Sequence, residues 1–178
     1  MRKGIKILII VFIVQTIASC CGHVKFYDYD SMIVSESDLV IEDGENLELR
    51  LDAQNIDFLS FRLSQLGHNQ SFAYDCDKGW GGMKHRITDI TIVSDSDFDY
   101  SHAVGISLDD LFMYSKFRGD GQYEWVELTD LNDYNSNSIT LKLKTRPTNG
   151  LNHKFFITIT KSNSELIKVE SNTIEWVE

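Results

Sequence analysis

Apolar and polar residues alternate at period two through much of the chain. The alternating runs are Leu47–Leu51, Leu59–Leu63, Ile90–Ile92, Ile139–Leu143, Phe155–Ile159 and Ile174–Trp176. Successive side chains of a strand point to opposite faces, so each run has one face for a core and one for water. This pattern predicts an all-β fold built from half-buried strands.

Short turn sequences separate these runs and predict how they are connected. They are Asp43-Gly44, Gly119-Asp-Gly121, Asn135-Ser-Asn137 and Asn149-Gly150. Residues 139–145, 154–161 and 166–170 are expected to follow one another as a meander. Ser107-Leu-Asp-Asp110 is similar to a capping box and predicts one short helix near 108–115. We therefore expect a single β-sandwich, immunoglobulin- or transthyretin-like, over residues 20–178.

The first nineteen residues have the pattern of a signal peptide. Arg2, Lys3 and Lys6 precede the apolar run Ile7–Val14, which is too short for a span of about 20 residues. The following Ile17-Ala-Ser-Cys20 resembles the lipobox of bacterial lipoproteins. The resemblance implies cleavage before Cys20 and attachment of diacylglycerol (with palmitate among the acyl chains) to its sulfur, which would anchor the protein to a membrane. The alternative is an ordinary secretory signal with Cys20 as a plain thiol.

The charge of the chain limits the partners that it can have. The whole sequence has a formal net charge of −10, and removing residues 1–19, with three basic and no acidic residues, makes it −13. Phosphate contacts need clustered Lys or Arg, so this balance of charge argues against nucleic acid as a partner and against electrostatic binding to anionic lipid. The N-terminal lipid is therefore the expected link to the membrane.

Two cysteines remain if Cys20 is acylated. Cys21 and Cys76 can form a disulfide in an oxidising envelope, or stay as two thiols. The spacing of the cysteines and histidines does not indicate a structural zinc site.

A longer stretch resembles a known family. Ile87-Thr-Asp-Ile-Thr-Ile-Val-Ser-Asp-Ser-Asp-Phe-Asp99 and Ala103-Val-Gly-Ile-Ser-Leu-Asp-Asp-Leu-Phe112 resemble a family of Bacteroidetes lipoproteins of unknown function. The resemblance implies an envelope lipoprotein with a β-sandwich and assigns no catalytic residue. Because no acidic residue precedes Asp28 after the lipobox, the outer-membrane lipoprotein is expected to face the periplasm.

Two further motifs suggest a modification and a metal. Asp30-Ser31-Met32 is similar to the O-glycosylation pattern of exported Bacteroidetes proteins, which implies glycosylation at Ser31. Asp95, Asp97 and Asp99 could converge on calcium. An EF-hand loop would need glycine and glutamate where this chain has Tyr100 and Ile106. The simpler interpretation is a solvated turn with Phe98 in the core.

An unusual glycine-rich loop holds Trp80, in Gly79-Trp-Gly-Gly82. A tryptophan on such a loop can stack on a sugar or anchor a protein partner. The alternative is a lid that folds back over the sandwich.

The motifs of common enzyme classes are missing from the sequence. It has no G-x-S-x-G, no phosphate-binding P-loop and no G-x-G-x-x-G, and it indicates no cofactor. We therefore expect a lipid-anchored envelope module without catalytic residues, which binds a glycan or envelope protein or has a structural role. The alternative is a hydrolase of glycan or peptidoglycan fragments with acids brought together by the fold.

Overall fold

The described residues of this computed structural model are 26–59, 79 and 81–177. They belong to two compact units. One combines the described parts of 1–28 and 57–84, and the other consists of Tyr29–Ile56 and His85–Glu178. Each unit is described by itself.

The smaller unit is built on a two-stranded antiparallel sheet. β1 (Phe26–Asp28) pairs with β5 (Asp57–Leu59), and Met83 forms a parallel bridge with Tyr27. Gly79 has a positive φ of 78°, and a Cβ at this position would lie 2.8 Å from Cδ1 of Tyr27. Only glycine therefore fits here without a shift of the Tyr27 ring.

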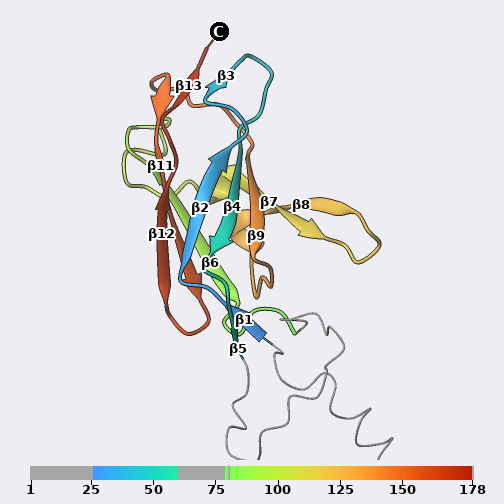
Figure 1. Cartoon of the computed structure of the whole chain (residues 1–178). Coiled ribbons are helices and arrows are strands. Elements are labelled where there is room, and N and C mark those ends of the chain that lie inside the picture. The colour runs from blue at the N-terminus through green and yellow to red at the C-terminus, as the bar shows by residue number, and fades with distance from the viewer. Residues whose placement is uncertain (1–25, 60–78, 80, 178) are drawn as a thin grey trace, which may run out of the picture. The chain divides into compact units, whose positions relative to one another are not determined.

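The larger unit contains a five-stranded antiparallel sheet (Figure 1). Its order is β2 (Ser31–Glu36), β4 (Glu48–Gln54), β9 (Ser138–Leu143), β7 (Phe112–Phe117) and β8 (Tyr123–Glu127). The buried residues of the central strands occupy alternate positions, as in Leu49 and Leu51 of β4. The opposite face of the sheet carries polar side chains such as Arg50 and Thr140.

Two three-stranded sheets complete this unit. One has the order β12 (Leu166–Glu170), β11 (Phe155–Lys161) and β6 (Ile87–Ser94), and is antiparallel. The other has the order β10 (Asn152–His153), β13 (Ile174–Trp176) and β3 (Val40–Ile41), with β13 and β3 parallel. The single-turn 3-10 helices η1 (Asp109–Leu111) and η2 (Leu128–Asp130) lie in the connections.

Aromatic rings fill the core between the sheets. Phe112 of β7 meets Phe155 of β11 edge to face, with ring centroids 5.8 Å apart. Phe155 also lies 6.4 Å from Phe98 and 6.2 Å from Trp176, and all four rings are buried. Contacts between rings of different sheets define an all-β sandwich, which confirms the predicted fold class.

The predicted helix near 108–115 is shorter than expected. Only η1 is helical, and from Phe112 onward the chain is strand β7. Ser107 Oγ accepts the N–H of Asp109 at 3.2 Å, but the turn does not propagate. Phe112 and Tyr114 are buried at period two, and pairing with two neighbouring strands outweighs a helix too short to be stable alone.

The predicted C-terminal meander is partly wrong. β11 and β12 form the expected hairpin, but β9 pairs with β4 and β7 while β11 pairs with β6. The chain therefore crosses from one sheet to another through residues 144–154. Alternation specifies a buried face but not the sheet to which that face belongs.

Candidate ligand-binding groove

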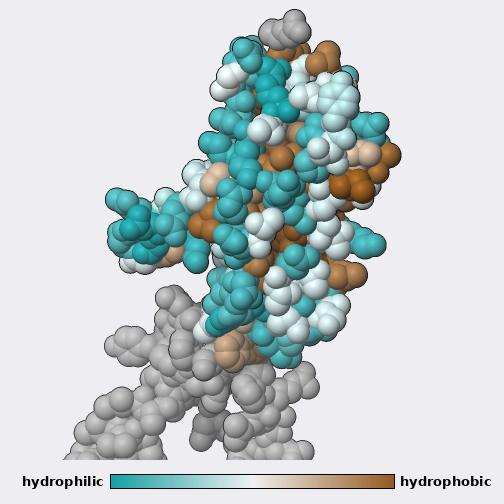
Figure 2. All heavy atoms as spheres, turned by 180° about the vertical axis from the view of Figure 1, so that it is seen from behind, coloured by the Kyte–Doolittle hydropathy of each residue, from teal (hydrophilic) through white to brown (hydrophobic). Residues whose placement is uncertain are grey.

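Strands β7 and β9 separate partway along the five-stranded sheet. The pairing of these two strands ends at Tyr114 and Leu141. Beyond this point β7 continues from Ser115 to Phe117 and pairs with β8, while Ser138 of β9 pairs with β4. The β7–β8 hairpin thus projects from the sandwich, as Figure 1 shows, and hydrophilic residues cover much of it in Figure 2.

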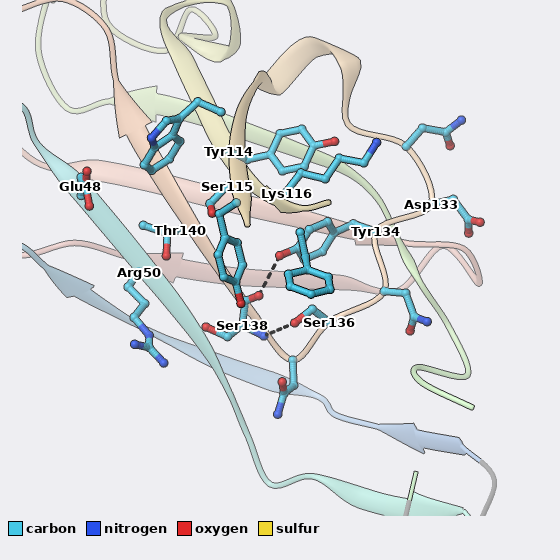
Figure 3. A pocket seen from close by; sticks show the side chains of 16 residues that line it. Glu48, Arg50, Tyr114, Ser115, Lys116, Asp133, Tyr134, Ser136, Ser138 and Thr140 are labelled. Atoms are coloured by element: carbon cyan, nitrogen blue, oxygen red, sulfur yellow. Dashed lines mark hydrogen bonds between the residues drawn. The ribbon is translucent and has the colours of Figure 1, made fainter. Parts of the chain in front are cut away.

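An open groove of about 860 Å³ lies where the two strands separate. Side chains of β4, β7, β8 and β9 line it together with the loop at 132–137 (Figure 3). All of these elements belong to the larger unit. The groove is therefore a product of one sandwich and of its projecting hairpin.

One wall of the groove is held by hydrogen bonds around Ser138. The Tyr134 hydroxyl donates to the Ser138 carbonyl at 3.0 Å, and the Ser138 N–H donates to Ser136 Oγ at 3.2 Å (Figure 3). The Tyr134 ring also packs edge to face on buried Tyr114, with centroids 5.7 Å apart. Loop side chains thus satisfy the backbone of β9 where β7 has left it.

Three aromatic side chains of the hairpin reach solvent along the groove. Tyr123 is 71% exposed, Phe117 55% and Trp125 38%. Phe117 and Tyr123 are opposite each other in register, with ring centroids 5.4 Å apart. The ammonium of Lys142 lies 5.4 Å from the centroid of Trp125. Each of these rings therefore has a neighbouring side chain packed against it.

The other residues that line the groove are mainly polar, and their positive and negative charges are equal in number. Asparagine side chains and serine and threonine hydroxyls come from the 132–137 loop and from β7 and β9. The charged lining residues are Glu48, Arg50, Lys116 and Asp133. The formal charge of the lining is thus zero in a chain of net charge −10.

Several predicted site residues lie outside the described residues. These are Cys20, Cys21, Cys76 and Trp80, so lipidation, the disulfide and the tryptophan anchor stay predictions. Ser31 begins β2 and is half-buried. Its hydroxyl donates to Asp30 Oδ1 at 3.0 Å and accepts from Asn55 Nδ2 at 3.4 Å, so both contacts would have to rearrange on glycosylation.

The carboxylates of Asp95, Asp97 and Asp99 shape their own loop. Each accepts a backbone N–H: Asp95 from Lys154 at 2.9 Å, Asp97 from Val104 at 2.8 Å, and Asp99 from Ser101 at 2.7 Å. Phe98 between them is fully buried. Among the described residues, no group of three or more His, Cys, Asp or Glu side chains could hold a metal ion.

A serine–histidine contact lies in the core rather than in the groove. Both Ser94 Oγ and Ser96 Oγ are within hydrogen-bonding distance of His153 Nδ1, at 2.9 and 3.0 Å. His153 Nε2 lies 2.9 Å from the Asn149 carbonyl, which fixes the tautomer with the proton on Nε2. Ser94 and His153 are buried, so their contact joins β6 to β10 inside the core.

His102 holds the 95–110 loop through two carboxylates. Its Nδ1 lies 2.9 Å from Asp99 Oδ1, and its Nε2 lies 3.2 Å from Asp110 Oδ1. Partial burial opposes protonation of the imidazole, but the hydrogen bond to Asp99 and the charges of both aspartates outweigh it and raise the His102 pKa. Desolvation likewise opposes ionisation of Asp99, but hydrogen bonds from His102 and Ser101 lower the Asp99 pKa.

We predict that the contacts of His102 with Asp99 and Asp110 make the stability of this loop dependent on pH. A raised histidine pKa stabilises the fold below the unfolded-state value of about 6.5, and this stabilisation is lost as the pH rises through the folded pKa. The lowered Asp99 pKa adds stability above about pH 4, which is lost on further acidification. NMR titration should place the His102 pKa above that of an unstructured histidine peptide. Asp99→Asn should lower it more than Asp110→Asn, because Asp110 is 62% exposed. A value at or below the peptide's would contradict the prediction.

The groove is not among the sites predicted from the sequence. Tyr123-Glu-Trp125, one residue after Gly119-Asp-Gly121, was the signal that could have found it, because a turn followed by period two places both rings on one face. No protein-family model matches the chain, and a search of curated proteins finds no significant match. No helix among the described residues is long and apolar enough to cross a membrane.

Proposed function

We propose that the chain is a lipid-anchored, non-catalytic carbohydrate-binding protein of the cell envelope and that the groove is its binding site. The observation that carries this proposal is the exposed Phe117, Tyr123 and Trp125 beside amides and hydroxyls in one open groove. A sugar ring has C–H faces that stack on aromatic rings and hydroxyls that bond to polar groups. The groove offers both kinds of contact side by side.

Other polymeric ligands fit the groove less well. A peptide strand inserted next to β9 would need free backbone groups there, but those of Ser138 already bond to Ser136 and Tyr134. A nucleic acid would need an excess of basic residues, and the formal charge of the lining is zero. A glycan requires neither free backbone groups on β9 nor an excess of basic residues.

In this proposal, the lipid attached to Cys20 determines the cellular location of the protein. A lipid-held module on the periplasmic side of the outer membrane would keep its groove available to glycans of the envelope. Metabolic labelling with palmitate should mark the protein, and Cys20→Ser should abolish both the label and membrane fractionation. Unlabelled protein with unchanged fractionation would remove the anchor from the proposal.

Glycan binding is tested with a glycan array followed by isothermal titration of the best binder. Trp125→Ala should weaken that affinity about 10-fold or more, because a central aromatic side chain carries much of the energy of such a site. The matched control is Phe156→Ala, which removes another exposed ring of the same unit, on β11. Equal losses in both variants would contradict a site at the groove, and release of shortened glycan products would favour the hydrolase.

A further inference from the structure

We infer that the groove binds an internal stretch of an uncharged polysaccharide, with two adjacent sugar subsites on Tyr123 and Trp125. This inference rests on the proposed function and specifies its ligand. Three features carry it: the spacing of the two rings, the small residue opposite Trp125, and the balance of charge.

The spacing of the rings suits consecutive sugar residues. Tyr123 and Trp125 are separated by one residue of β8 and so point to the same face. Two residues of an antiparallel strand span about 6.8 Å, so the two side chains form neighbouring aromatic platforms along β8. Tyr123 and Trp125 can therefore each stack on one of two linked sugars.

The register of β7 gives the two rings different surroundings. Phe117 lies opposite Tyr123 and supports its ring. Ser115 lies opposite Trp125, so on this strand a small hydroxyl-bearing side chain stands beside the indole. Lys142 of β9 packs against the same indole through its ammonium. The Trp125 subsite thus combines an aromatic face with the neighbouring hydroxyl of Ser115.

The charge and size of the groove specify the ligand further. A site for uronic or sulfated sugars would carry an excess of Arg and Lys, but Arg50 and Lys116 are balanced by Glu48 and Asp133. Arg50 already pairs with Asp52, with Nε 2.9 Å from Oδ2, and Asp133 accepts from Arg86. The volume of about 860 Å³ is near the upper end of the usual range for small-molecule pockets, so an open groove of this size suits several sugar residues of a chain.

The inference is tested by titrating the protein with neutral oligosaccharides of increasing length. The probes are the cello-, chito- and malto-oligosaccharide series from one to six sugars, with oligogalacturonates as the charged comparison. In the series that binds, affinity should rise about 10-fold from one to two sugars and level off once the groove is filled. Blocking the reducing end should leave the affinity of the longer oligomers unchanged.

Variants separate the two subsites. Tyr123→Ala should remove most of the gain from the second sugar, and Tyr123→Phe should keep it because the ring remains. Trp125→Ala should weaken binding of every length. Both residues are exposed, so thermal unfolding should be nearly unchanged and would reveal a misfolded variant.

The outcomes distinguish this inference from the proposed function. Length-independent binding, or tighter binding of oligogalacturonates, would overturn the inference and leave glycan binding in place. Loss of binding on blocking the reducing end would replace an internal stretch with a chain end. Absence of binding to every probe in both the array and the titrations would overturn the inference and the proposed function together.

Discussion

Phe155→Ala is expected to lower the free energy of unfolding of the larger unit by about 3–5 kcal/mol. Phe155 is fully buried and its ring meets Phe98, Phe112 and Trp176, which lie in different parts of the sandwich. Truncation removes the transfer energy of the ring and leaves a cavity that well-packed aromatic neighbours cannot close. Chemical denaturation followed by circular dichroism measures the change.

Phe156→Ala is the matched control for this prediction. Phe156 is the next residue of β11, but it points to the opposite face and is 40% exposed. The ammonium of Lys154 lies 5.8 Å from the centroid of its ring. The expected loss is below about 1 kcal/mol, because an exposed cation–π contact contributes about 0.5–1 kcal/mol. Similar losses in the two variants would contradict the assignment of Phe155 to the centre of the core.

Lys161→Ala is expected to destabilise the same unit by about 2–5 kcal/mol, because it empties a buried site and removes a buried donor. The Lys161 side chain is fully buried at the end of β11. Its ammonium donates to the Tyr29 carbonyl, lies 3.1 Å from Glu165 Oε2 and lies 4.8 Å from the centroid of the Tyr29 ring. Alanine would leave the carbonyl and the carboxylate without this donor and would also empty the space of the lysine stem.

Lys161→Met separates the charge of this side chain from its volume. Methionine keeps most of the stem but cannot donate to Tyr29, so the expected loss is about 1–3 kcal/mol for removing this donor from a buried site. Denaturation of both variants at one pH gives the comparison. A methionine variant as stable as the original protein would mean that the ammonium adds nothing to stability and that packing explains the whole alanine effect.

The strands of the sandwich were predictable from local pattern. Leu49, Leu51, Ile139, Leu141 and Ile157 are buried at the alternate positions that period two indicates. The location of Phe98 in the core also agrees with the turn interpretation of Asp95 to Asp99. Each of these inferences depends only on which face of a strand is apolar, and that is a property of neighbouring residues.

The candidate groove was not predictable in the same way. Ser115, Ser138 and Thr140 look in the sequence like ordinary solvent-facing strand residues. They line a groove because β7 leaves β9 after Tyr114 and because Tyr134 comes from another loop to bond to Ser138. Neither the separation of β7 from β9 nor the hydrogen bond from Tyr134 changes the pattern of apolar and polar residues in these strands.

The sequence by itself determined that this chain forms amphipathic strands and that it is acidic, with a formal net charge of −10. Only the tertiary structure decided that β9 and β11 enter different sheets, that the region after Ser107 is mainly strand, and that a hairpin with Tyr123 and Trp125 projects beside a polar loop. The physical reason is that alternation arises from each strand's own side chains. Strand pairing and the point where two strands separate depend instead on contacts between residues far apart in the chain.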